Sequence, residues 1–117
     1  MAAWYPESFS EVGNVHYVLL YELADDYMER RAPLRNAHLS LAWLTQEAGD
    51  LVLAGALDEP ADGALFVFEG SGPETAERFA QSDPYVTNGL VTSWRVRPWT
   101  TVVGERATNP MRPDHPE

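Results

Sequence analysis

The order of strand-like and helix-like segments limits the folds open to this chain more than any other feature. Runs rich in β-branched and aromatic residues predict strands, and apolar residues that recur every three or four positions predict helices. By these criteria the segments follow the order β-α-β-β-α-β. The expected strands are 15–23, 51–57, 64–69 and 90–103, the expected helices are 33–48 and 73–82, and a polar helical turn is expected at 25–31.

This order predicts an α+β domain of the ferredoxin-like kind. Because crossover connections are right-handed, the first two strands run in the same direction with the third inserted between them. The expected result is an antiparallel sheet of order 4-1-3-2 with both helices on one face. The two helices then run antiparallel, so the first half of one lies at the same end of the domain as the last turn of the other.

The predicted domain occupies residues 15–103, which is an ordinary size for one domain. Residues 1–14 are an N-terminal extension, either loose or docked through its aromatic residues. Residues 104–117 are a C-terminal tail without apolar periodicity, which we expect to be removable with little loss of stability. The first three strands are apolar on both faces while the helices cover one, so a second copy of the chain is expected on the other. The N-terminal extension is the competing cover.

Composition excludes several classes of function. The formal net charge is −10 and all eight basic residues are Arg, so the surface repels nucleic acid phosphates and anionic membranes. The absence of Cys excludes disulfides, thiol catalysis and Cys-ligated metals, and no spacing motif predicts a metal site or a cofactor. No apolar run is long enough to span a bilayer and the first residues lack signal-peptide features, so we expect a cytoplasmic protein.

His38 and Asp83 are the candidate catalytic residues. His38 is expected at the edge of a helical stripe, about 70° from its centre at 100° per residue. Asp83 is expected to end the second helix on its inward face, where the helix dipole disfavours negative charge. The antiparallel helices bring both residues to one end of the domain, so their side chains are expected to meet. A carboxylate beside an imidazole fixes its tautomer and raises its basicity, which suits a general base. The stripe consists of Leu34, Ala37, Leu41, Leu44 and Ala48.

Each candidate also has a simpler interpretation. Asp83 could be an ordinary helix-ending residue, because the residue before a proline leaves the helix. Arg35, one turn before His38, could hold a substrate carboxylate or phenolate, or could pair with surface acids. Tyr21 and Tyr85 could line a pocket or belong to the core. His16 lies on the first strand and is expected to be structural or at the dimer face.

Four stretches of the chain carry a resemblance to a known family. They are Tyr17-Val-Leu-Leu-Tyr21, Arg31-Ala-Pro-Leu-Arg35-Asn-Ala-His38-Leu, Leu51-Val-Leu-Ala-Gly55-Ala-Leu, and Asp83-Pro-Tyr85-Val with Gly89-Leu90. In this order they resemble the YciI-like, or YCII-related, proteins over residues 15–103. The resemblance implies a usually dimeric, ferredoxin-like domain related to the dimeric α+β barrels. It also implies a site built on a His and an Asp, here His38 and Asp83. One branch of that family includes a dehydrochlorinase of a chlorinated hydroxyhydroquinone, and no residue here singles out that substrate.

The leading functional hypothesis is a cofactor-independent acid–base enzyme acting on a small cyclic or aromatic organic acid. His38 would be the base, Asp83 its orienting partner and Arg35 the anion anchor. The alternatives are a ligand-binding module without chemistry and a purely structural dimerisation module. An apolar pocket beside His38 would favour the first two hypotheses, whereas a ring with both nitrogens bonded to the backbone would favour the third. Residue types leave the substrate and the reaction open.

Overall fold

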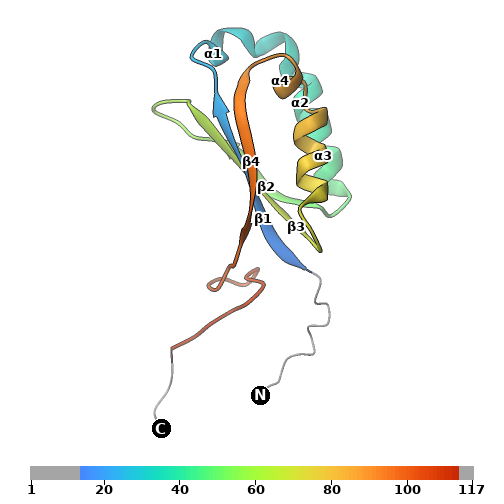
Figure 1. Ribbon diagram of the computed structural model, residues 1–117, viewed down its shortest axis with the longest axis vertical. Coiled ribbons are helices and arrows are strands. Elements are labelled where there is room, and N and C mark those ends of the chain that lie inside the picture. Colours follow the sequence, from blue (N-terminus) through green and yellow to red (C-terminus); the bar gives the residue numbers. More distant parts are fainter. Residues whose placement is uncertain (1–13, 114–117) are drawn as a thin grey trace.

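A four-stranded sheet carries both long helices on one face in the computed structural model, which describes residues 14–113 (Figure 1). The sheet order is β2-β3-β1-β4, which confirms the predicted order 4-1-3-2 read from the other edge. Every neighbouring pair is antiparallel. The elements are β1 (Val15–Leu23), α1 (Tyr27–Arg30), α2 (Ala32–Glu47), β2 (Leu51–Ala56), β3 (Gly63–Gly70), α3 (Glu74–Ser82), α4 (Pro84–Thr87) and β4 (Val91–Trp99).

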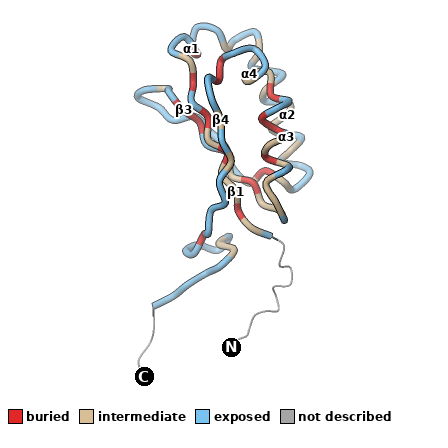
Figure 2. The backbone as a smooth tube through the Cα atoms, viewed as in Figure 1, coloured by how far each residue is buried: buried red, intermediate tan, exposed pale blue. Residues whose placement is uncertain are grey.

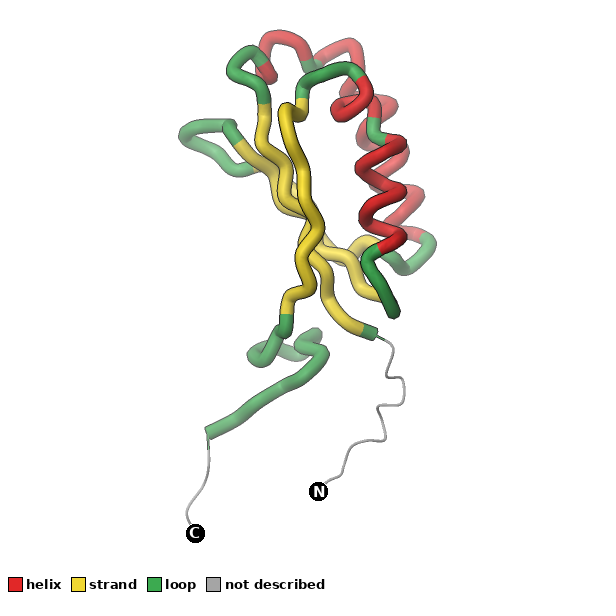
Figure 3. Tube along the Cα trace, in the orientation of Figure 1, coloured by secondary structure: helices red, strands yellow, loops and turns green. Residues whose placement is uncertain are grey.

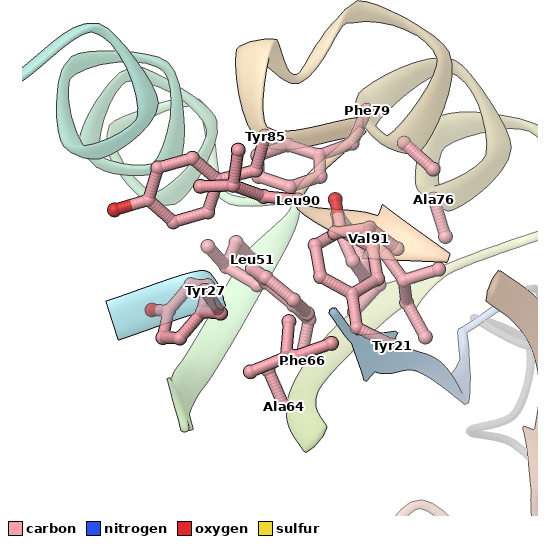
Figure 4. Packing of buried hydrophobic residues seen from close by; sticks show 14 residues of the cluster. Tyr21, Tyr27, Leu51, Ala64, Phe66, Ala76, Phe79, Tyr85, Leu90 and Val91 are labelled. Carbon is pink, nitrogen blue, oxygen red and sulfur yellow. The ribbon is translucent and has the colours of Figure 1, made fainter. Parts of the chain in front are cut away.

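The core lies between the sheet and the helices (Figure 2). Alternate residues of β1 face the helices, since successive side chains of a strand point to opposite faces. Leu19 pairs with Phe66 of β3, and Tyr21 pairs with Ala64. Phe79 and Ala80 of α3 close this layer from above, and all six side chains are buried. Figure 4 shows the buried cluster from close by. Burying such a layer is the main stabilising term of the fold, at roughly 25 cal/mol for each Å² of apolar surface.

The face that α2 turns toward the sheet differs from the prediction. Ala37, Leu44 and Ala48 of the predicted stripe are exposed, and Leu44 retains 64% of its accessible surface. The α2 residues packed against the core are Leu34, Leu41 and Ala42. At 100° per residue, this face is rotated by about 60° from the predicted stripe. His38 therefore lies at the centre of the inward face, and its placement at the edge was wrong.

The prediction placed the wrong face of α2 inward because it assumed that the apolar stripe is buried, whereas α2 has no fully buried residue. It lies over the β2 edge of the sheet, and a cavity separates much of it from the strands. Apolar burial alone therefore does not fix the rotation of this helix. The contacts of the His38 side chain, described below, favour the observed one.

Within the described residues, no helix covers the other face of the sheet (Figure 3). Val18 pairs with Val67 there and Leu20 with Leu65, so the centre of this face is apolar. Leu65 is 39% exposed. The predicted second copy would pack here. The competing cover, the N-terminal extension, lies outside the described residues except for Asn14.

β4 ends at Trp99, four residues earlier than predicted, because the chain then folds back on itself. The N–H of Asn109 donates to the carbonyl of Thr101 at 3.0 Å, and the N–H of Met111 donates to that of Val102 at 2.8 Å. The part of the C-terminal tail that the structure describes is thus tied to the end of β4. Within residues 14–113, no helix has the length and apolar character needed to cross a membrane.

Candidate functional site

Asp83 occupies the junction of two helices. Its backbone is extended, with φ −72° and ψ 124°, and it separates α3 from α4. Pro84 explains why α3 ends and α4 begins here. A proline keeps the preceding residue out of a helix, and it suits the first position of the next helix. Asp83 Oδ1 accepts the N–H of Tyr85 at 3.0 Å, so the carboxylate is the N-cap of α4.

Asp83 ends α3 as predicted, because it is the C-cap of that helix. It is also the N-cap of α4, which the prediction did not include. Its carboxylate caps the start of α4, a position at which acceptor side chains stabilise a helix and negative charge is favoured. The contact with His38 confirms the inward direction of the side chain, and the cap supplies a local reason for a carboxylate here.

Three donors surround the Asp83 carboxylate, which is 0% exposed. The Tyr21 hydroxyl donates to Oδ2 at 2.6 Å, and the N–H of Tyr85 donates to Oδ1. His38 Nδ1 lies 2.9 Å from Oδ1 and 3.0 Å from Oδ2. These bonds replace the hydration that a buried carboxylate loses. Burial and the neighbouring Asp83 charge raise the pKa of Tyr21 well above its usual range, so its hydroxyl remains a donor.

The His38 ring is held on three sides. It stacks on the Tyr85 ring with centroids 3.9 Å apart and planes within 6°. Phe66 and Phe79 meet it edge-on at 6.2 and 6.5 Å. Because Nδ1 faces an acceptor, the proton of the neutral ring is on Nδ1 and the lone pair is on Nε2. Among residues 14–113 Nε2 has no hydrogen-bond partner, and the side chain is 12% exposed.

A cavity of about 390 Å³ opens beside His38, between α2 and the β2–β3 edge of the sheet. Its volume is in the range of pockets that hold small organic molecules. Leu51, Ala64 and Phe66 give it an apolar floor, and Trp43 contributes to the wall from α2. Polar side chains gather at one end, toward α1 and the first turns of α2: Tyr27, Arg31, Arg35 and Tyr85.

The five residues singled out in the sequence come together here. His38 and Asp83 are in contact, as expected, and His38, Arg35, Tyr21 and Tyr85 line the cavity. Asp83 does not line it, because the carboxylate lies behind the imidazole. The Tyr21 hydroxyl serves Asp83, so only the ring of this residue is available to the cavity.

Sequence reasoning missed two residues at the polar end of the cavity, Tyr27 and Arg31. Arg31 precedes Arg35 by four residues, a spacing that places both on one helix face, so it could have been found. Tyr27 gives no comparable signal, because it lies in a short polar turn. In the part of the chain that the structure describes, no group of three or more His, Asp or Glu side chains could hold a metal ion.

His16 occupies a different environment on the other face of the sheet. It is 3% exposed, and its Nδ1 lies 2.7 Å from Thr101 Oγ1. Its Nε2 lies 3.4 Å from Glu69 Oε1 without hydrogen-bond geometry. The cavity beside His38 does not include His16. Its contacts join β1 to the segment after β4, which agrees with the structural role expected for it.

Comparison with known proteins agrees with this fold. The model of the YCII-related domain matches residues 15–100. The chain is 30% identical over 95 residues to the protein YciI of Escherichia coli O6:H1, covering 74% of this chain and 97% of that protein. The YciI protein of Shigella flexneri gives the same values.

Solved structures share the fold at low sequence identity. One is a 5-chloro-2-hydroxyhydroquinone dehydrochlorinase from Burkholderia phenoliruptrix in complex with 2,5-dihydroxybenzoquinone. It has a TM-score of 0.63 and 16% identity, over 74% of this chain and 94% of that chain. Another is a NIPSNAP family protein from Agrobacterium tumefaciens, with a TM-score of 0.51 and 11% identity over 81% and 97% of the two chains. The structural neighbours are of the dimeric α+β barrel type.

Proposed function

The chain belongs to the YCII-related domain family, and from that membership and the geometry around His38 we propose a cofactor-independent acid–base enzyme. Its substrate would be a small cyclic or aromatic organic acid. The observation that carries the proposal is the environment of the two nitrogens of the His38 ring. A buried carboxylate holds Nδ1 at 2.9 Å, while Nε2, without a partner in residues 14–113, belongs to a ring that lines a cavity.

In the proposed reaction His38 Nε2 removes a proton from a ring hydroxyl or an activated carbon of the substrate. The imidazolium that forms carries its charge beside the Asp83 carboxylate, which stabilises it. Tyr21 and the Tyr85 N–H keep that carboxylate in place. Arg35 holds an anionic group of the substrate, and the proton is then returned to the substrate or released to water.

The nature of the cavity supports a ring-shaped substrate. Its floor is apolar, and its volume of about 390 Å³ has room for a single six-membered ring with substituents. The structural neighbour from B. phenoliruptrix was solved with such a ring compound, 2,5-dihydroxybenzoquinone. Because that neighbour shares 16% identity with this chain, it supports ring compounds as the substrate class. It does not support the neighbour's own chlorinated compound as the substrate here.

A ligand-binding module without chemistry is the alternative, since the same cavity would serve it. The third hypothesis, a purely structural dimerisation module, is disfavoured. It expects both imidazole nitrogens to bond to the backbone, whereas Nδ1 bonds to a carboxylate and Nε2 has no partner within residues 14–113.

Hydrogen–deuterium exchange into substrate carbons tests the enzyme. Wild-type protein is incubated in D₂O with a panel of hydroxylated benzoquinones, benzoates and cyclic keto acids, and exchange is followed by proton NMR. We expect catalysed exchange for at least one compound and a loss of a hundredfold or more in His38→Gln, on the order of a general base's contribution. His16→Gln, checked for folding by circular dichroism, is the matched control and should retain activity.

Two outcomes would reject the enzyme. Equal exchange in wild type and His38→Gln would remove the base from the proposal. Binding of panel compounds without any catalysed exchange would favour the ligand-binding alternative.

We also propose that the chain forms a homodimer through the open face of the sheet. Leu65 lies at the apolar centre of this face and is 39% exposed. Sedimentation at micromolar concentration should give twice the chain mass for wild type. Leu65→Glu should give the monomer mass, whereas Leu44→Glu, at a 64% exposed position on α2, should leave the dimer intact. A monomeric wild type would reject the proposal.

A further inference from the structure

One end of the cavity concentrates four side chains able to bind an anion: Tyr27, Arg31, Arg35 and Tyr85. Both tyrosines are buried, at 5% and 3% exposure, and their rings meet edge to face with centroids 5.7 Å apart. The Arg31 guanidinium carbon lies 5.6 Å above the centre of the Tyr27 ring, which orients this cation. The site proposed above uses only Arg35 of these four as a charge partner.

Neither of the two arginines has a carboxylate within 4.0 Å among residues 14–113. This is notable because the chain carries 18 acidic and eight basic side chains. The adjacent Arg30, which does not line the cavity, lies 3.4 Å from Asp26. Two cations placed one helical turn apart, i and i+4, repel each other, and an anion between them would relieve that repulsion.

The Tyr85 phenol at this end is a donor at neutral pH. Burial, and then the neighbouring Tyr27, raise the pKa of Tyr85 to about 12, against the opposing effect of Arg35 and Arg31. A protonated hydroxyl and two guanidinium groups match the oxygens of a carboxylate, which accepts bidentate hydrogen bonds from Arg. The ring of the same Tyr85 stacks on His38, so this residue belongs to the polar end of the cavity and also contacts the imidazole.

We propose that Arg31, Arg35 and the hydroxyls of Tyr27 and Tyr85 form a carboxylate subsite, separate from the His38–Asp83 pair. The substrate class is then a hydroxylated aromatic or cyclic carboxylic acid. Its carboxylate binds at this subsite while its reactive hydroxyl or C–H faces His38 Nε2. The placement of the reactive hydroxyl or C–H at His38 rests on the proposed function. The carboxylate subsite itself rests on the cavity and its charged side chains.

A pair of probes that differ by one carboxylate tests the subsite by isothermal titration calorimetry. The probes are 2,5-dihydroxybenzoate and hydroquinone. Wild type should bind the benzoate about tenfold more tightly or better, as expected for charge-assisted hydrogen bonds. Arg31→Gln and Arg35→Gln should each reduce this ratio to about twofold or less and leave hydroquinone affinity unchanged. Arg78→Gln, an exposed residue of α3 outside the cavity, makes the same change of charge and should keep the full ratio.

The outcomes separate this proposal from the enzyme proposal. His38→Gln should keep the carboxylate preference while losing catalysed exchange, so a preference without catalysis retains the subsite and rejects only the enzyme. Equal affinity for the two probes, or no measurable binding of either at millimolar concentration, would overturn the subsite. So would a preference that survives in the Arg31→Gln, Arg35→Gln double variant, or one that Arg78→Gln reduces equally.

Discussion

Residues 14–113 contain two histidines beside carboxylates, and the two environments differ in what surrounds the pair. His38 contacts Asp83, which is 0% exposed and accepts three donors, and its ring lines a cavity. His16 lies 3.4 Å from Glu69, whose side chain is 26% exposed, and the segment after β4 closes over it. A carboxylate near an imidazole is thus common to both. The neighbouring space and the rigidity of the carboxylate distinguish a candidate base from a structural histidine.

The two carboxylates also differ in how firmly their positions are fixed. Backbone and side-chain donors fix Asp83 from three directions, so the carboxylate cannot turn away from His38. Within residues 14–113 the Glu69 carboxylate makes two long contacts, one to His16 at 3.4 Å and one to Arg106 at 3.6 Å. We therefore expect the variants below to affect the two histidine regions unequally.

The largest expected effect is on stability. Asp83→Ala leaves the Tyr21 hydroxyl, the Tyr85 N–H and His38 Nδ1 without their acceptor in a buried place. Breaking a buried charged network in this way should lower the free energy of unfolding by about 3 to 5 kcal/mol. Glu69→Ala should cost less than about 1 kcal/mol, because its contacts are long and its own side chain is partly exposed. Urea unfolding of both variants measures the difference. Equal losses of unfolding free energy would show that Asp83 is no more important for stability than Glu69.

A single hydroxyl should give a smaller effect. Tyr21→Phe removes the 2.6 Å bond to Asp83 and should cost about 1 to 2 kcal/mol at neutral pH. Thr101→Val, which removes the hydroxyl beside His16, is its counterpart and should cost a similar amount. A neutral result for Tyr21→Phe would mean that the hydroxyl is not needed to hold Asp83.

Alkaline pH distinguishes these two variants. The pKa values of Tyr21 and Tyr85 are raised in the folded state, so the unfolded chain loses these phenol protons first, near pH 10. The stability contributed by the neutral phenols is present below pH 10 and is lost as the pH rises above it. Tyr21→Phe should therefore lose stability less steeply than wild type above pH 10, whereas Thr101→Val should follow the wild-type slope.

Removal of residues 105–117 should have a smaller effect again. It deletes the backbone bonds of Asn109 and Met111 and the Thr108 N–H bond to Thr101, all at the border of the domain. We expect a cost of about 1 kcal/mol, since few apolar groups are lost, and an unchanged His38 site. A loss of many degrees in melting temperature would show that this segment belongs to the core or to an interface.

The smallest expected effect concerns which nitrogen of the His38 ring carries the proton. Asp83→Asn replaces an acceptor-only group by one that can also donate, so the preference of His38 for the Nδ1–H tautomer should weaken. Nitrogen-15 shifts of the imidazole rings at alkaline pH would report this change. Glu69→Gln should leave the His16 shifts nearly unchanged, because Thr101 faces Nδ1 there. Unchanged His38 shifts in Asp83→Asn would contradict the orienting role given to Asp83.

The strands, the two long helices and their order follow from sequence patterns alone. The β-branched and aromatic run of Val15–Leu23 and the helical spacing in 33–48 are local patterns, so they can be recognised without knowledge of the rest of the chain. Right-handed crossovers then left one sheet order, which placed His38 and Asp83 at the same end. Arg35, Tyr21 and Tyr85 followed because they lie at that end of their elements.

Three features depend on the tertiary structure: the rotation of α2, the face of the sheet that each histidine meets and the helix that Asp83 caps. The amphipathic pattern of α2 is too weak to fix its rotation, and a cavity beneath the helix removes the packing that would do so. The role of Asp83 as the cap of α4 depends on a four-residue helix that has no periodic signal of its own. Tyr27 reaches the cavity from α1, which is also a four-residue helix without a periodic signal. Such features arise from contacts between distant segments, and local sequence periodicity does not encode those contacts.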